Sequence, residues 1–216
     1  MLLLAGCGDL KRVKGSGNAK TESRSLTEFM FIQFEGRGKV VVNEGKESTI
    51  RLTIDDNLLP LISTDVNHSM LTIRGTSNYS STLGLVAEVT TPQLWALAIS
   101  GAGHLIASNI NSTNLLLRIT GTGKIQAKGT TQRLESKISG SGNIDAEELE
   151  ARFAEITIIG AGNIRVHVSD ELTVKIVGAG NVQYAGNPKS VRKTVTGAGV
   201  VKPISADPKL KPANIP

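Results

Sequence analysis

The chain has 216 residues, of which 23 are glycine and only 3% are aromatic. Its apolar residues are mainly Leu, Ile, Val and Ala, a composition that favours β-structure with many turns and a narrow interior. The formal net charge is +5, but Lys and Arg are scattered and form no basic stripe with stacking aromatic residues, so nucleic acid is not an expected partner. A single cysteine excludes an intrachain disulfide.

That cysteine, Cys7, ends the segment Leu4-Ala5-Gly6-Cys7 and precedes a polar segment. The segment resembles the lipobox of bacterial lipoproteins, in which a signal peptidase cuts before the cysteine and acyl chains are attached to it. The resemblance implies lipidation of Cys7, a membrane partner reached through that lipid, and a place in the cell envelope. Gly8 rather than Asp after the cysteine implies the outer membrane by resemblance to Gram-negative sorting rules, on either its periplasmic or its exposed side.

The start of the chain departs from a usual lipoprotein signal. Only Met1 to Gly6 precede Cys7, whereas a secretory signal has a basic start and about 7 to 15 apolar residues. We infer either a start codon placed too late or a shortened chain. The alternative is an apolar terminus with an incidental free cysteine. No other segment has 18 consecutive apolar residues, so none is predicted to span a membrane.

Six Gly-x-Gly triplets recur between residues 95 and 203, at offsets of 18 to 20 residues. A fixed period of this length indicates a repeat architecture. We expect each triplet to form a turn, either because its backbone needs a positive φ or because there is no room for a Cβ. The turn glycines are Gly101, Gly103, Gly121, Gly123, Gly140, Gly142, Gly160, Gly162, Gly178, Gly180, Gly197 and Gly199.

The residues around these triplets alternate between aliphatic and polar. A β-branched residue stands two positions before each triplet, as in Ile99, Ile119 and Ile138, and aliphatic residues follow at the second position after it. Such alternation on both sides of a glycine turn predicts strand, turn, strand. The same inward face is expected to continue upstream through Trp95, Leu115, Leu134, Ala154, Leu172 and Val191.

One such unit cannot bury its inner face alone, so successive units must stack in parallel ladders about 4.8 Å apart. We therefore predict an all-β fold, a single-stranded parallel β-helix (β-solenoid) with about 19 to 20 residues per coil. Asn143, Asn163 and Asn181 are expected to form a partial amide ladder beside three turns. Both ends would expose strand edges, so a cap, a partner or association of copies through the ends is expected.

The predicted organisation has four parts. They are a lipoprotein signal remnant at 1–7, a linker at 8–21, one solenoid domain at 22–203 with irregular coils at 22–92 and regular coils at 93–203, and a Pro/Lys-rich tail at 204–216.

Several short motifs occur in a characteristic order: Gly15-Ser16-Gly17-Asn18, then 24–29, then 55–59, then 71–73, then serial Gly-x-Gly-Asn turns. With them the chain resembles the bacterial family of putative auto-transporter adhesins with a head GIN domain, over residues 14–201. The resemblance implies a secreted or lipid-anchored β-helical protein of Gram-negative bacteria, with a right-handed helix. It brings no catalytic residues.

No catalytic or metal constellation is evident in the sequence. The outward positions are not expected to stack acids across coils, since Asp145 lies between Gln126 and Arg165, and the acidic patch at 147–150 is expected to be a solvated loop. Asp55 and Asp56 are expected to cap local backbone groups rather than bind a cation. His68, His104 and His167 are far apart in the sequence. We therefore expect no metal, no cofactor and no enzymatic activity.

The sequence favours a non-catalytic envelope lipoprotein, an adhesin or binding scaffold whose solenoid face binds a glycan or a protein. Two alternatives stay open: a carbohydrate-active enzyme of the β-helix type, in which Asp145 or Glu148 would be essential, and a structural envelope protein that assembles through the solenoid ends. The expected binding face consists of Arg118, Gln126, Lys137, Arg165, Lys175 and Gln183.

Overall fold

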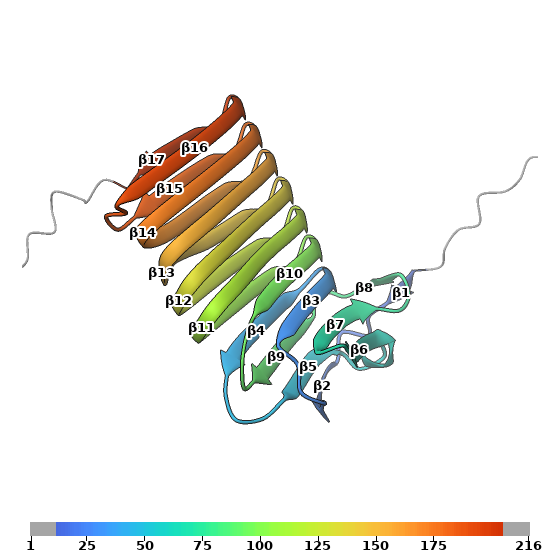
Figure 1. Ribbon diagram of the computed structural model, residues 1–216. Coiled ribbons are helices and arrows are strands. Elements are labelled where there is room, and N and C mark those ends of the chain that lie inside the picture. The colour runs from blue at the N-terminus through green and yellow to red at the C-terminus, as the bar shows by residue number, and fades with distance from the viewer. Residues whose placement is uncertain (1–11, 205–216) are drawn as a thin grey trace, which may run out of the picture.

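A computed structural model describes residues 12–204, which form a stack of parallel β-coils with an irregular head at the N-terminal end (Figure 1). Residues 1–11 and 205–216 lie outside the described part, and with them Cys7 and almost all of the predicted tail. Within residues 12–204 no helix has the length and hydrophobicity needed to cross a membrane. The helical structure described there is one 3-10 turn, η1 (Leu59–Leu61).

The regular coils confirm the predicted β-solenoid. Each long strand runs from one glycine corner to the next, and every strand pair in this region is parallel. The strands are β10 (Ala96–Gly101), β11 (His104–Gly121), β12 (Lys124–Gly140), β13 (Asn143–Gly160), β14 (Asn163–Gly178), β15 (Asn181–Ala185), β16 (Ser190–Gly197) and β17 (Val200–Pro203).

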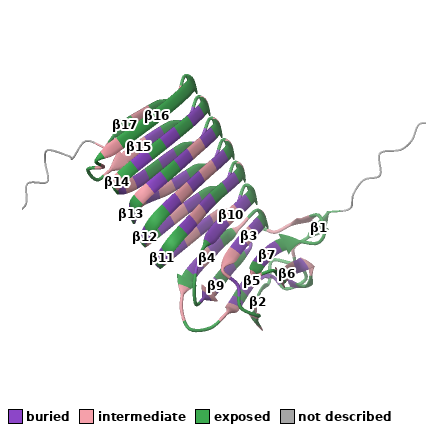
Figure 2. Ribbon diagram, viewed as in Figure 1, coloured by how far each residue is buried: buried purple, intermediate pink, exposed green. Residues whose placement is uncertain are grey.

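The strand register places equivalent repeat positions directly beside one another. Ile99 pairs with Ile119, and Ile119 with Ile138, so the β-branched residues before the corners form one buried column. Figure 2 shows the resulting alternation of buried and exposed positions along each coil. Burial of each such side chain contributes roughly 1.5–3 kcal/mol, so this column helps to hold the coils together.

Each corner needs its two glycines for different reasons. The first glycine of the six triplets has φ between +116° and +126°, a region that side chains other than glycine rarely adopt. The second glycine lies against the preceding coil: a Cβ on Gly142 would be 2.6 Å from Cγ2 of Ile119. The β-branched column and the glycine corners therefore require each other.

Opposite the glycine corners the strands bend, and the register shifts there. One shift lies between Ala107 and Ile110 and another between Gln126 and Gly129. Such bulges absorb an extra residue without disturbing the ladders on either side. They explain how coils of 18 to 20 residues stack in register at the glycine corners.

The N-terminal region contains a further coil that the periodicity did not reveal. Gly36 pairs with Gly101, so Gly36-Arg37-Gly38 is a seventh corner. Its spacing to the next triplet is broken by an insertion, which hid it from a search for a fixed period. The strands here are β1 (Val13–Lys14), β2 (Ala19–Ser25), β3 (Phe31–Gly36), β4 (Lys39–Glu44), β5 (Thr49–Asp55), β6 (Ile62–Asn67), β7 (Met70–Gly75), β8 (Tyr79–Ser80) and β9 (Val86–Thr91).

In this region the spatial order of the coils departs from the sequence order. The coil made by β3 and β4 lies between the β7 and β9 layer and the regular coils. Three strands, β2, β5 and β6, pair antiparallel and cover this end of the stack, an arrangement that irregular coils alone do not include. β1 and the start of β2 lie within the segment 8–21 that was expected to be a linker, because β1 pairs with β8 and β2 with β5.

Candidate functional site

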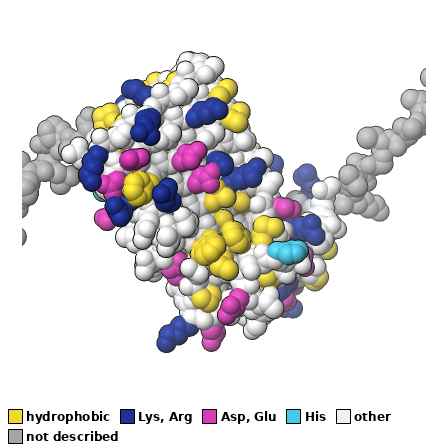
Figure 3. All heavy atoms as spheres, in the orientation of Figure 1, with side chains coloured by type: hydrophobic (Ala, Val, Ile, Leu, Met, Phe, Trp, Pro, Cys, Tyr) yellow, Lys and Arg dark blue, Asp and Glu magenta, His cyan; other side chains and the backbone are white. Residues whose placement is uncertain are grey.

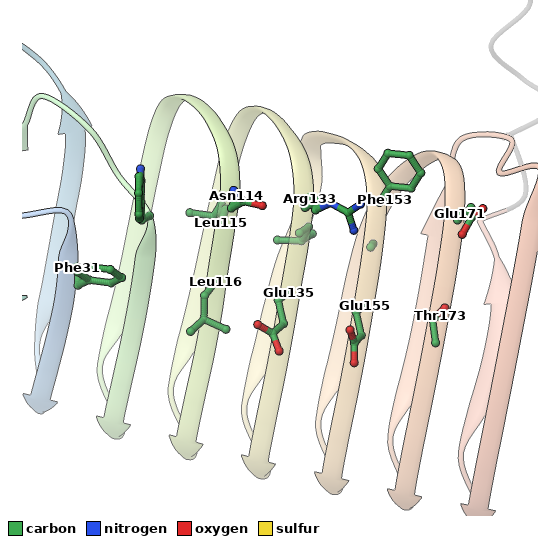
Figure 4. A pocket seen from close by; sticks show the side chains of 13 residues that line it. Phe31, Asn114, Leu115, Leu116, Arg133, Glu135, Phe153, Glu155, Glu171 and Thr173 are labelled. Atoms are coloured by element: carbon green, nitrogen blue, oxygen red, sulfur yellow. The ribbon is translucent and has the colours of Figure 1, made fainter.

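A groove with a volume of about 450 Å³ crosses the strand segments that precede the glycine corners. It extends from β3 over Trp95, the residue directly before β10, to β11, β12, β13 and β14 (Figure 4). Three of the chain's seven aromatic residues, Phe31, Trp95 and Phe153, line it. Its other lining residues are Asn114, Leu115, Leu116, Arg133, Leu134, Glu135, Ala154, Glu155, Glu171 and Thr173.

Eight lining residues form two rows because the coils stack in register. Leu116, Glu135, Glu155 and Thr173 are register partners on successive strands, and Figure 4 shows them side by side. A second row, two residues earlier on each strand, consists of Asn114, Arg133, Phe153 and Glu171. The groove therefore presents one side chain of each row per coil, at about the 4.8 Å strand spacing.

Trp95 lies at the N-terminal end of the groove and is 42% exposed. Its ring contacts Phe31 edge to face, with the centroids 6.1 Å apart and the planes at 82°. The prediction that Trp95 continues the inward column is wrong. Leu94 is fully buried instead, and β10 begins only at Ala96, so the indole is turned out of the column before the regular alternation starts.

Phe153 contacts two arginines at the edge of the groove. The guanidinium carbons of Arg133 and Arg152 are 5.1 and 5.3 Å from its ring centroid, within the range of cation–π attraction. Arg152 is also held by Asp170, with its Nε 2.9 Å from the carboxylate. These contacts fix the position of Phe153 and engage its ring, so Trp95 is the more accessible aromatic residue of the groove.

Carboxylates stack across the coils in this groove, contrary to the sequence-based expectation. Glu135 and Glu155 are direct register partners on β12 and β13. The expectation was wrong because only the positions after the corners were compared, whereas these two residues precede them. Glu135 forms an ion pair with Lys137, while Glu155 is exposed.

The six residues of the expected binding face occupy two separate surfaces. Arg118, Lys137 and Lys175 lie in one row beside the groove. Gln126, Arg165 and Gln183 share a row on the strand segments after the corners, with Asp145 between the first two. Buried residues of both segments point to a common interior, so the outward rows point in different directions. Their role in binding stays a prediction.

Other polar residues of the coils pair locally. The Asn ladder is confirmed: Asn163 donates to Asn143 at 2.9 Å, and Asn181 donates to Asn163 at 3.1 Å. In the acidic patch Glu148 pairs with Lys128 at 2.7 Å and Glu147 with Arg165 at 3.0 Å.

The histidines are not grouped with other metal ligands. His104 Nε2 lies 2.9 Å from the Gln126 side-chain oxygen. Among residues 12–204 no three His, Cys, Asp or Glu side chains gather as a metal site.

Asp55 fastens the N-terminal segment to the head. Its buried carboxylate accepts hydrogen bonds from the Ser81 hydroxyl and from the backbone N–H of Gly17, the latter at 2.7 Å. The Ser81 hydrogen bond is the main reason that the pKa of Asp55 lies below its ordinary value; burial opposes this shift and the Gly17 N–H supports it. The prediction of local capping is wrong for Asp55, whose donors are 38 and 26 residues away along the chain, and is confirmed for Asp56, which accepts a hydrogen bond from the Asn57 backbone N–H at 2.7 Å.

Comparison with known families identifies one match. The family model described as putative auto-transporter adhesin, head GIN domain, matches residues 28–188. Among curated proteins the comparison finds no match.

Several solved structures share the fold. A putative adhesin from Bacteroides fragilis has a TM-score of 0.73 at 21% identity, covering 89% of this chain and 100% of that one. A putative adhesin from Parabacteroides merdae has a TM-score of 0.57 at 21% identity, covering 89% and 99%. A putative lipid binding protein from Parabacteroides distasonis has a TM-score of 0.55 at 23% identity, covering 90% and 100%.

Proposed function

The chain belongs to the family of putative auto-transporter adhesins with a head GIN domain, and from this premise we propose that it is a non-catalytic binding protein of the cell envelope. Its binding surface is the aromatic groove on the strand segments before the glycine corners. The family name supports an envelope or surface setting, and the solenoid supplies a rigid, extended face.

The observation that carries this proposal is the exposed Trp95, which packs edge to face on the half-buried Phe31 in the groove. Trp95 is the only tryptophan of the chain, and 42% of it remains exposed although the solenoid buries most of its large apolar side chains. Figure 3 shows hydrophobic side chains gathered over β3, β10 and β11, with charged side chains around them. An apolar patch with a polar rim is typical of a binding surface. Because ladders hold the strands in place, little ordering is needed when a ligand binds.

Lipidation of Cys7 would orient this surface on a membrane. Six peptide units join Cys7 to Val13, the first residue of β1, and even fully extended they reach only about 20 Å. An acylated Cys7 would therefore keep the capped head near the membrane. The regular coils extend from this head in Figure 1, so the groove would be presented beyond it.

The register neighbours Glu135 and Glu155 raise glycan cleavage as a second candidate function. Retaining glycosidases use two carboxyl groups about 5 Å apart, close to the strand spacing. Against it, Glu135 is paired with Lys137 and the groove is open to water, whereas a catalytic acid of this type needs apolar surroundings. Binding without turnover therefore fits this site better.

Location is tested by protease shaving of intact cells that express the native chain or Cys7→Ala, each tagged after Lys211. We expect the native tag to be cleaved on intact cells and the Cys7→Ala protein to leave the membrane fraction. Full protection of the native tag, with recovery from the cytoplasm after lysis, would contradict an envelope protein.

Binding is tested by the adherence of the same cells to immobilised glycoprotein and to immobilised matrix protein. Trp95→Ala should reduce adherence, while Arg165→Ala, on the surface after the corners, should not. Equal adherence of native and Trp95→Ala cells would show that the groove is not the binding surface.

A further inference from the structure

We infer that the ligand of the aromatic groove is an uncharged glycan chain that lies across the strands, with one sugar ring against Trp95. This inference rests on the proposed function and narrows it to one class of ligand. It follows from three properties of the groove: its aromatic end, its mixed hydrogen-bonding rows and its direction relative to the strands.

The aromatic end offers a surface suited to a sugar ring. A pyranose has an apolar C–H face and a rim of hydroxyl groups, so it needs an apolar platform with polar groups beside it. Trp95 supplies a large apolar body with a polar N–H, and Phe31 supports it from one side, edge to face. Leu116, half-buried on the next strand, continues the apolar floor.

The rows beyond Trp95 supply both kinds of hydrogen-bonding partner. Sugar hydroxyls donate and accept, so a glycan site needs acceptors and donors close together. Glu135 and Glu155 carry acceptors, and Arg133 and Asn114 carry donors. All four lie in the same groove, on β11, β12 and β13 (Figure 4). The stacking of Phe153 on Arg133 holds that guanidinium in place.

The direction of the groove favours a chain over a single small molecule. Its lining begins at Phe31 on β3, continues over four intervening strands and ends at Thr173 on β14. Six neighbouring strands span about 24 Å at the usual spacing. One strand spacing is close to the length of one pyranose residue in a chain, so a linear glycan of about five residues would present each ring to one coil.

The charges favour a neutral glycan over an anionic one. Three carboxylates line the groove, those of Glu135, Glu155 and Glu171, and they would repel a uronate or sulfate. Arg133 within the groove and Lys137 at its edge offset part of this charge, so a cationic ligand gains little either. A bound protein strand is also disfavoured, because the backbone groups of these strands are engaged in the parallel ladders.

The position of the single tryptophan allows a direct test. Titration of the folded chain with neutral β-linked and α-linked oligosaccharides of two to seven residues is followed by Trp95 fluorescence. We expect a saturable change, with affinity rising with length up to about five residues. Glu155→Gln should weaken binding by about tenfold or more, since a hydrogen bond to a charged group is lost. Gln126→Ala, on the other surface, should bind like the native chain, and circular dichroism checks that each variant is folded.

The outcomes separate this inference from the proposed function. Suppose that no neutral glycan changes the fluorescence, while adherence to immobilised matrix protein depends on Trp95. The glycan would then be the wrong ligand, but the proposed function of the groove as a binding surface would stand. Stronger binding of acidic than of neutral oligosaccharides would overturn the charge argument. If the chain binds a neutral glycan but the protease experiment recovers it from the cytoplasm, the inferred ligand would be supported and the proposed envelope location would be contradicted. Shortening of the oligosaccharide, detected by chromatography, would contradict a non-catalytic role.

Discussion

At the scale of single residues, the second glycine of a corner is limited by a side chain and a carbonyl oxygen of the preceding coil. A Cβ at Gly142 would lie 2.6 Å from Cγ2 of Ile119 and 2.9 Å from the Gly123 carbonyl oxygen. The first glycine is limited by its own backbone and by the preceding corner, since Gly140 has φ of +125° and a Cβ there would meet the Gly121 carbonyl oxygen. Truncation of Ile119 should therefore relieve an alanine at the second glycine, but not an alanine at the first.

We predict that Gly142→Ala and Ile119→Ala are each destabilising but couple when combined. Ile119→Ala alone should cost about 2–5 kcal/mol of unfolding free energy through the cavity it leaves. In the double variant the new methyl occupies part of that cavity, so the loss should fall short of the sum by about 0.5–3 kcal/mol. Denaturant titration measures both. In a matched cycle, the losses of unfolding free energy in Gly140→Ala and Ile119→Ala should nearly add, because the positive φ at residue 140 remains strained for alanine. Equal coupling in both cycles would contradict a contact specific to Gly142 and Ile119.

A second residue-scale prediction concerns Asp55 and acid stability. Its pKa in the folded chain lies below the ordinary value of 3.8, so it stabilises the fold above that pH and this contribution is lost as the pH falls through the folded-state pKa. Asp55→Asn should lower the unfolding free energy at neutral pH and flatten its decline in acid. Ser81→Ala, which removes the main donor to the carboxylate, should likewise flatten the decline of the unfolding free energy in acid. Denaturant titration from pH 7 to 2 measures this decline. If it is the same in Asp55→Asn as in the native chain, Asp55 does not contribute to stability in this way.

At the scale of elements, the two ends of the solenoid are finished differently. Antiparallel strands cover the N-terminal end, whereas β16 and β17 pair on one side only within the described residues. Val191 and Val195, in the inward column, are 37% and 38% exposed. Between them Lys193 occupies the position that buried Val174 fills one coil earlier. An inward charge at a strand edge opposes pairing with another chain.

We therefore predict that Lys193→Ile promotes self-association through this end. Removal of the charge would leave a continuous aliphatic patch beside unpaired strand edges, so the average mass in solution should rise with concentration. Sedimentation velocity measures this. Thr194→Ile, on the outward side of the same strand, adds a similar apolar group and should leave the mass unchanged. If both variants associate equally, general hydrophobicity rather than the open end is responsible.

At the scale of the whole molecule, the coils form a nearly one-dimensional stack in which each one is stabilised by its neighbours. β12 and β13 have partners on both sides, while β16 and β17 have one each. We predict that amide hydrogen exchange is slowest in β12 and β13 and fastest in β16 and β17, with smaller losses toward the capped N-terminal end. Mass-spectrometric exchange of peptides from each strand measures this gradient. Uniform protection would mean that the stack opens only as a whole.

The sequence by itself determined the regular half of this protein. A period of 18 to 20 residues, β-branched residues before each corner and paired glycines within it were enough to predict a parallel solenoid and its inward column. The Asn ladder also followed from the repeat. These features depend on neighbours one coil apart. Because the same local pattern is repeated in each coil, they can be predicted from the spacing of residues in the sequence.

Only the tertiary structure decided the order of the head strands, the outward turn of Trp95 and the grouping of the groove residues. Phe31 lies beside β10, more than sixty residues along the chain, because an insertion separates the Gly36 corner from the periodic ones. Glu135 and Glu155 are neighbours because both precede a corner in register. The expected binding face is split over two surfaces because some of its residues precede the corners and others follow them. The physical reason is that stacking register and the exit path of a strand are set by packing between distant segments, which no local pattern encodes.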